Sequence, residues 1–493
     1  MAVLSHSLKD VAVIYCRQQK RTGVCALMEL RIDRQAMVPV VQQIVDGLTE
    51  WIMQGQVPPT TRLPSVREIA RCNLLSQSCV MEACQRLVAQ GVLASRQGSG
   101  FMVASSLPDC CKAIDGTGCE GERSGGGPAA RWRGGLTLGS GVLPESWREP
   151  DDLAYAIREV ARADMASLFN YSTPLGLPAL REQIIKRLGL LSIRAVAEQV
   201  MTTAGASHGL DLIVRTLFKA GDCVVVETPG YAPLFDLLRL HGVRMLEVRR
   251  TPGGPDLEAL EALLQQFRPA ALFINSHHHN PTGSCLLPAV ARRILELSRL
   301  YDLRLIEDDV YADLHNGSGT RLAALDDEGR VIYVGSFSKT LSSSLRVGFV
   351  LADGELIERM ARVKMISCMG TSRFCEAVLA GMLASGAYRK LVQRQRQRLN
   401  TDRAAALQAL EDAGWEVFGK PTGGLFIWAR APLADEAHLR RQASRCGVQL
   451  SCATSFSPSG EACDWQRINV AYACDPRARQ FFRSTTVDRP QAF

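Results

Sequence analysis

The chain has 493 residues, of which 46% are hydrophobic and 22% charged, and its formal net charge is +7. This length exceeds what one hydrophobic core usually organises, and so small a charge excess does not by itself indicate a nucleic-acid-binding protein. The 16 cysteines are scattered without a CxxC pair, which favours a reducing cytoplasm over a disulfide-linked secreted protein. The short apolar run 11–15 is too short for a signal peptide or a membrane span, so we expect no membrane association.

The first predicted elements are three short helices followed by a hairpin. Apolar residues recur at three- and four-residue steps from Val40, which predicts an amphipathic helix. Ser65 and Glu68 have the spacing of a capping box, which predicts the start of a second helix. A third helix capped by Ser76 or Ser78 precedes two strands, and this order predicts a winged helix-turn-helix. The expected boundaries are 1–36 for an unassigned extension, 37–104 for this domain, 105–135 for a linker and 136–493 for the remaining domain.

Residues 105–135 are rich in glycine, serine, proline and charged residues, with Gly125–Pro128 at the centre. Such a composition lacks the periodic apolar pattern of a packed element and predicts a flexible linker. Its Cys110, Cys111 and Cys119 have no His or Cys partner at zinc-finger spacing. We therefore expect exposed reduced thiols there.

Beyond the linker, apolar runs alternate with helical patterns over some 360 residues. This alternation predicts an α/β domain with a mainly parallel sheet. Functional groups of such a domain gather at the carboxyl ends of its strands. The runs expected to be buried strands are Cys223–Val226, Ala271–Asn275, Leu303–Ile306 and Val331–Val334, and Ala289–Leu300 is one of the expected helices.

The segments RLPSVREIA, 62–70, and GVLASRQGSG, 91–100, resemble the GntR-type winged helix-turn-helix. A helix that begins with small polar side chains fits a major groove about 12 Å wide, and the resemblance implies a double-stranded DNA operator as partner. Family members commonly have Arg and Thr in this opening turn, whereas this chain has Ser76-Gln77-Ser78-Cys79, so we expect a different base preference. The residues expected at the DNA are Arg62, Ser65, Arg67, Ser76, Gln77, Ser78, Arg96 and Gly98.

A lysine just after a buried strand is suited to Schiff-base chemistry, because removal from water lowers the pKa of its amine. Lys339 occupies this place in the segment SFSKT, 336–340. With the motifs below, this segment resembles the class I and II aminotransferases of fold type I, and the resemblance spans 137–472. It implies a pyridoxal 5'-phosphate (PLP) cofactor attached to Lys339, with Ser336 and Arg346 at the cofactor phosphate and Ser338 as a further cofactor-binding residue.

Two loops carry further motifs of that family. Asp308 follows a buried strand, and a carboxylate there can keep a pyridine nitrogen protonated; the resemblance assigns Asp308 to the ring nitrogen and Tyr311 to the 3'-oxygen. In the segment NPTG, 280–283, Asn280 matches a donor to the same oxygen. The preceding His277 and His278 suggest a metal site, which we do not favour because consecutive side chains of an extended segment point to opposite faces.

The remaining candidates concern the phosphate, the ring and a substrate. Small residues at a helix start present free N–H groups to a phosphate. The candidates are Gly205, Ala206 and Ser207 at the phosphate and, by resemblance, Tyr231 stacked on the ring, Tyr171 at the phosphate of the neighbouring subunit of a homodimer, and Arg467 at the carboxylate of a substrate or effector.

Together the two halves resemble the MocR subfamily of GntR-type regulators over residues 37–472. The resemblance implies a small α+β winged helix-turn-helix followed by an α/β PLP-dependent transferase of fold type I with large and small subdomains. We expect a cytoplasmic transcriptional regulator that senses PLP or an amino-acid-like effector. A catalytically active aminotransferase with an accessory DNA-binding domain stays open, because the same residues serve binding and catalysis; we expect any such activity to be weak. A DNA-binding protein whose large domain only dimerises fits the complete cofactor set least.

Overall fold

The computed structural model describes residues 30, 32, 39–54, 61–89, 92–96, 100–104, 135–148, 150–163, 169–315, 319–432 and 436–485. The chain divides into two compact units, Met1–Cys119 and Glu120–Phe493, and each is described by itself. Nearly all of the expected extension and linker lies outside the described residues. So do the predicted turn residue Gly98 and the three linker cysteines.

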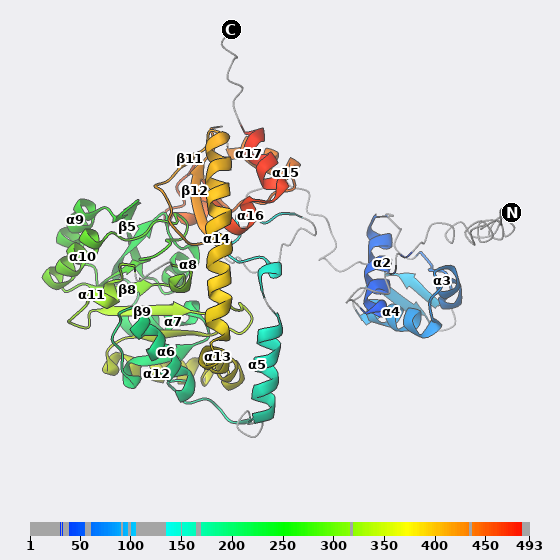
Figure 1. Ribbon diagram of the computed structural model, residues 1–493, viewed down its shortest axis with the longest axis horizontal. Helices are drawn as coiled ribbons and strands as arrows, with labels where there is room; N and C mark the ends of the chain where they lie inside the picture. The colour runs from blue at the N-terminus through cyan, green and yellow to red at the C-terminus, as the bar shows by residue number, and fades with distance from the viewer. Residues whose placement is uncertain are drawn as a thin grey trace, which may run out of the picture. The chain divides into compact units, whose positions relative to one another are not determined.

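The N-terminal unit has the predicted three helices and hairpin (Figure 1). Helices α2 (Val40–Gln54), α3 (Val66–Cys72) and α4 (Gln77–Ala89) precede the strands β1 (Leu93–Arg96) and β2 (Gly100–Val103), which pair antiparallel. The apolar stripe of α2 supplies Ile44 and Leu48, which are fully buried against Val80 and Leu87 of α4. Each such burial stabilises the fold by about 1.5–3 kcal/mol.

Side-chain caps fix where two of these helices begin. Ser65 Oγ accepts a hydrogen bond from the Glu68 backbone N–H at 3.2 Å, and Glu68 Oε2 accepts one from the Ser65 N–H at 2.8 Å, so the capping box is confirmed. Ser76 Oγ accepts from the Cys79 N–H at 3.2 Å. Ser76, not Ser78, therefore caps α4.

The C-terminal unit is built on an eight-stranded sheet with the strand order β3-β10-β9-β8-β7-β4-β5-β6. Strands β4, β5, β7, β8 and β9 are parallel to one another, as predicted, while β10 runs antiparallel to both β9 and β3. The four strands expected from apolar runs are β4, β7, β8 and β9. The bounds are β3 Val200–Thr203, β4 Cys223–Thr228, β5 Arg244–Thr251, β6 Gly254–Pro255, β7 Ala271–Ile274, β8 Arg304–Asp308, β9 Val331–Ser336 and β10 Gly348–Leu351.

Both faces of the sheet are covered, which explains why its central strands are apolar without alternation. On β4, Val224 and Val226 belong to one buried cluster and Val225 belongs to another. The first cluster includes residues of α7 (Ala206–Leu217), α8 (Ala232–Leu240) and α12 (Gly354–Cys368), and the second includes residues of α9 (Leu257–Phe267) and α10 (Pro288–Tyr301). Also on this unit lie α5 (Pro150–Ala163), α6 (Pro178–Leu190), α11 (Leu322–Leu325) and α13 (Arg373–Ala384).

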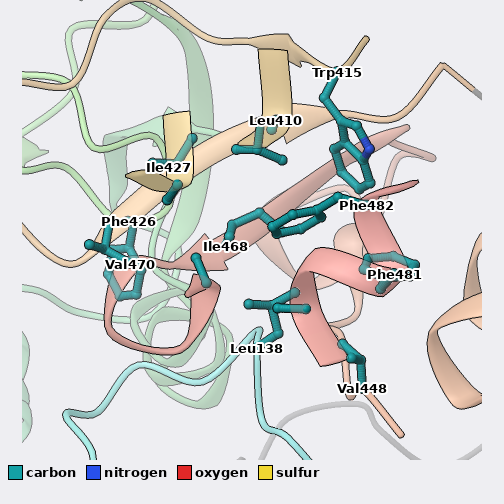
Figure 2. Packing of buried hydrophobic residues seen from close by; sticks show 14 of the residues in the cluster. Leu138, Leu410, Trp415, Phe426, Ile427, Val448, Ile468, Val470, Phe481 and Phe482 are labelled. Atoms are coloured by element: carbon teal, nitrogen blue, oxygen red, sulfur yellow. The ribbon is translucent and has the colours of Figure 1, made fainter. Parts of the chain in front are cut away.

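A smaller subdomain has its own core around the three-stranded sheet β11 (Glu416–Val417), β12 (Phe426–Arg430) and β13 (Trp465–Asn469). Figure 2 shows Trp415, Phe481 and Phe482 packed in this core. The long helix α14 (Ala387–Asp412) joins the two subdomains, because Tyr388 lies in a core cluster of the large one and Leu410 in that of the small one. The remaining helices are α15 (Glu436–Arg445), α16 (Val470–Ala473) and α17 (Pro476–Ser484).

The segment 136–143 crosses this small core and reaches the large sheet. Leu138 is fully buried in the small core, and its carbonyl accepts a hydrogen bond from the Asn469 N–H at 2.8 Å. The segment thereby carries Gly139 and Gly141 to the strand ends described below. Among the helices that the structure describes, none is long and apolar enough to cross a membrane.

Candidate cofactor and DNA-binding sites

The carboxyl ends of the parallel strands place four predicted side chains at one edge of the large sheet. Tyr231 follows β4, Asn280 follows β7, Asp308 ends β8 and Lys339 follows β9. Because β4, β7, β8 and β9 are neighbours in parallel register, their ends meet at the same edge.

Lys339 is the amine of this site. Its Nζ donates a hydrogen bond to the Gly141 carbonyl at 3.1 Å. Burial, with a smaller contribution from the Arg467 and Arg346 cations, lowers the pKa of Lys339 to about 8, and the Asp308 carboxylate opposes this shift. The neutral, nucleophilic fraction of the amine near neutral pH is therefore much larger than that of a lysine with the ordinary pKa.

Asp308 is a recessed carboxylate that makes no salt bridge to a described residue, although the nearby Lys339 ammonium tends to lower its pKa. Burial raises the pKa of its carboxyl to about 7, assisted by the neighbouring Asp309 and opposed by the Val310 N–H, which donates to Oδ1 at 3.3 Å. The Asn275 amide donates to the Asp308 carbonyl at 2.5 Å and so fixes the backbone there. Such a carboxyl lacks a strong donor, and a protonated ring nitrogen would supply one.

Two tyrosines and an asparagine flank this carboxylate. Tyr311 is 2% exposed and packs edge-on against the Phe426 ring at 5.6 Å between centroids, and burial raises its phenol pKa. Burial also raises the pKa of Tyr231. Both phenols therefore stay protonated and able to donate. Asn280 Oδ1 accepts from Arg467, which leaves the Asn280 amide N–H₂ group as a donor.

The predicted phosphate-binding residues converge on the start of α7. Gly205 is the residue before this helix, with φ +83°, and a Cβ built on it would lie 2.4 Å from Arg346 Nη2. Arg346 also donates to the Ala204 carbonyl at 3.1 Å and to Ser338 Oγ at 3.5 Å, so its guanidinium lies across the glycine. Helix N–H groups and a guanidinium without a carboxylate partner among the described residues form an anion site.

Arg467, from β13, lies close to Lys339. A Cβ built on Gly141 would be 3.8 Å from Lys339 Nζ and 3.9 Å from Arg467 Nη2. Arg467 donates to Asn280 Oδ1 at 2.8 Å and, through Nη2, to the Gly139 carbonyl at 2.7 Å. Its guanidinium also lies over the Phe426 ring at 4.8 Å from the centroid, and burial lowers its pKa to about 10.

None of the partners of Arg467 in the described part of the chain is a carboxylate. A buried cation of this kind is compensated best by an anion with two oxygens, such as a substrate carboxylate. The amine, the unpaired Asp308 carboxyl and the anion site thus fit the aldehyde, ring nitrogen and phosphate of PLP.

Tyr171 is the one predicted cofactor residue that stands apart. Its side chain is 76% exposed, in contrast to the recessed groups around Lys339. Such a position agrees with a contact to another subunit and excludes ordinary core packing as its role.

Several residues of the site were not predicted from the sequence. The carbonyls of Gly139 and Gly141 hold Arg467 and Lys339, and Phe456 packs on the Arg467 guanidinium at 4.9 Å. Asn275 links the Asn280 and Asp308 segments, since its Oδ1 accepts from the Asn280 N–H at 2.9 Å. The small-residue run at 139–141 was the one signal available for the glycines.

Most of the side chains that we expect to contact DNA belong to the described part of the N-terminal unit. Arg62 and Arg67 are exposed, and so are Ser76, Gln77 and Ser78 in the first turn of α4. Ser65 caps α3, and its hydroxyl is engaged with Glu68 Oε2 at 2.8 Å. Arg96 ends β1, but its side chain and the whole of Gly98 lie outside the described residues.

Comparisons with known proteins agree with both halves. Residues 133–480 match the family described as aminotransferase class I and II, and residues 40–103 match the family of bacterial regulatory proteins, gntR family. The chain is 27% identical over 472 residues to the uncharacterized HTH-type transcriptional regulator YdfD of Bacillus subtilis, covering 88% of this chain and 93% of the relative. It is 29% identical over 451 residues to the probable rhizopine catabolism regulatory protein MocR of Rhizobium meliloti, covering 86% and 88%.

A solved structure with the same fold is the kynurenine aminotransferase of Pyrococcus horikoshii in complex with PMP. It superposes with a TM-score of 0.67 at 27% identity, covering 71% of this chain and 90% of the other.

Proposed function

The chain belongs to the aminotransferase class I and II family and carries a gntR-family domain ahead of it, and we propose that it is a transcriptional regulator. This combination of domains is that of the MocR-type regulators. The proposed ligands are operator DNA, PLP and an amino-acid effector. The observation that carries the sensing half of this proposal is the buried Arg467 guanidinium, which has no carboxylate partner among the described residues and lies close to Lys339. The regulator would act in the bacterial cytoplasm, where its operator is.

Each part of the cofactor would have a partner in this chain. PLP supplies an aldehyde that condenses with amines and a ring that withdraws electrons. Lys339 would hold it covalently, the start of α7 with Arg346 would hold its phosphate, and Asp308 would hold the ring nitrogen. The raised pKa of Asp308 in the cofactor-free chain would fall once a protonated nitrogen faces it, since a nearby cation favours the charged carboxylate.

An amino acid would bind with its carboxylate on Arg467 and its amine toward Lys339. Such an effector regulates DNA binding only if it has different affinities for two arrangements of the protein. The segment 136–143 is suited to transmit the difference, because it follows the expected linker and offers the Gly139 and Gly141 carbonyls to the two effector-binding side chains.

We also propose a homodimer. Tyr171 is exposed together with Phe169, Ile366 and Met369, which are 85%, 88% and 50% exposed. The segments carrying Tyr171 and Met369 are adjacent, because Ser172 and Thr371 both donate to the buried Glu376 carboxylate. A second subunit covering this surface would bring Tyr171 to the neighbouring phosphate site.

The direct test of the DNA-binding half is selection of duplexes from a random library with the purified full-length protein. We expect enrichment of one sequence that the protein binds at least about a thousandfold more tightly than random DNA. The variant Arg67→Ala should bind it more weakly. Failure to enrich any sequence at physiological salt would overturn the proposal.

Catalytic transamination is the second candidate, favoured by the complete set of Lys339, Asp308 and Arg467. It predicts keto-acid formation at rates near the ~10 s⁻¹ typical of dedicated enzymes. The regulator predicts rates far below that with the same amino acids.

A further inference from the structure

Three histidines and a cysteine gather beside the candidate cofactor site without belonging to it. His277, His278 and Cys285 lie in the segment between β7 and α10, and His315 follows the short 3₁₀ helix Ala312–Leu314. Ligand atoms of His277, Cys285 and His315 all lie within 4.8 Å of one another. No step of the proposed cofactor binding uses these four side chains.

The alternation expected of consecutive side chains does not hold here. His278 has φ +49°, a left-handed conformation that reverses the direction of an extended chain. The ring of His315 therefore lies against both neighbours, with its centroid 4.5 Å from that of His277 and 5.1 Å from that of His278. His277 and His278 are therefore not on opposite faces of an extended segment, and a metal site at this segment is possible.

The ring nitrogens converge on a point beside Gly319, which has no side chain to fill it. A Cβ built there would lie 2.6 Å from His277 Nε2 and 2.9 Å from His315 Nε2. His278 lies between the other two groups, with Nε2 at 3.3 Å from His315 Nδ1 and Nδ1 at 3.7 Å from Cys285 Sγ. Its ring thus orients both of them.

His277 is a buried side chain whose ring nitrogens are poorly satisfied. It is 1% exposed, and neither ring nitrogen makes a hydrogen bond of normal geometry, although the Thr320 backbone lies close enough to the ring to raise its pKa against the effect of burial. A buried imidazole nitrogen without a partner is unfavourable unless it ligates a metal or meets a water molecule.

We propose that His277, His315 and Cys285 bind one Zn²⁺-class ion, with His278 holding the thiolate and the second imidazole in place. Two neutral imidazoles and a thiolate are a set that Zn²⁺ binds tetrahedrally, with the fourth position left for water. Binding converts the Cys285 thiol to a thiolate and releases one proton to solvent.

The test is metal content and Zn²⁺ titration of the full-length protein purified without a histidine tag. We expect one Zn²⁺ per chain by mass spectrometry of the metal after dialysis against metal-free buffer, and one equivalent rebound after chelation. Co²⁺ in its place should give the intense visible absorption of a four-coordinate ion. The double variant His277→Gln, Cys285→Ser should lose that equivalent and that absorption.

The matched control is the double variant His241→Gln, Cys223→Ser, whose residues lie elsewhere in the same unit and are not fully buried. It should keep the full equivalent. Cofactor absorption and near-ultraviolet circular dichroism show whether each variant is folded. Wild-type protein that binds no stoichiometric Zn²⁺ overturns the proposal without recourse to any variant, and so does a folded His277, Cys285 variant that binds as much Zn²⁺ as the control.

Discussion

Removing the Arg467 guanidinium should weaken binding of the amino-acid effector and leave PLP binding and basal DNA binding unchanged. In the structure its fork is held by Asn280 and the Gly139 carbonyl, and the charge has no carboxylate partner among the described residues. A bidentate carboxylate would make two charge-assisted hydrogen bonds of about 1.5–3 kcal/mol each. We therefore expect Arg467→Ala to weaken amino-acid binding by about 3–6 kcal/mol, a factor of about 150 to about 25,000 in Kd.

The assay is a spectroscopic or calorimetric titration of the PLP-loaded protein with a panel of amino acids and with the corresponding amines that lack the carboxylate. Wild-type protein should prefer each amino acid to its amine, and Arg467→Ala should lose that preference. Arg430→Ala is the matched control, since Arg430 lies on the neighbouring strand β12 but is exposed and paired with Glu416. Equal affinity of wild-type and Arg467→Ala protein for amino acids would refute the assignment of this arginine.

Three further outcomes follow from the same geometry. Borohydride should fix PLP to a peptide containing Lys339, and Lys339→Ala should retain no borohydride-stable cofactor; attachment to another peptide would contradict the assignment. Arg67→Ala should weaken DNA binding and reduce the slope of log affinity against log salt by about one, with the cofactor spectrum unchanged, as a fluorescence titration over several salt concentrations would measure. Because the folded, cofactor-free chain keeps a proton on Asp308 up to about pH 7 while the unfolded chain loses it at its ordinary pKa, stability should fall as pH rises through that window. Asp308→Asn should reduce this dependence in thermal melts of cofactor-free protein and leave the part that comes from Glu307, whose pKa burial also raises to about 7; a profile that the substitution does not change would show that the Asp308 carboxyl titrates normally.

The sequence predicts those parts of the fold whose pattern is local. Strands β4, β7, β8 and β9 are buried on both faces and therefore appear as uninterrupted apolar runs. Strand β5 (RMLEVRRT) mixes exposed arginines with buried residues, so it did not stand out. The antiparallel direction of β10 depends on its neighbours in the sheet, which a local pattern does not contain.

The residues of the site also divide into those that a local sequence pattern predicts and those that depend on tertiary context. Lys339, Asp308 and Asn280 stand in motifs at strand ends, and their proximity follows from a parallel sheet. Gly139 and Gly141 act through backbone carbonyls and come from a segment about 200 residues before Lys339, so no side-chain pattern reveals them. The left-handed backbone of His278 likewise depends on tertiary context, which is why the histidine cluster was not predicted.

Reciprocal titrations of DNA and amino acid show whether the two ligands are coupled through the protein. Labelled operator is titrated with PLP-loaded protein, with and without saturating amino acid, and the amino acid is titrated with and without operator. We expect a coupling factor of about 5 to 150, equal in both directions within error and absent from Arg467→Ala. If DNA affinity does not change with any amino acid or with removal of the cofactor, and keto acid forms at ~10 s⁻¹, the protein is instead an enzyme with a tethered DNA-binding domain.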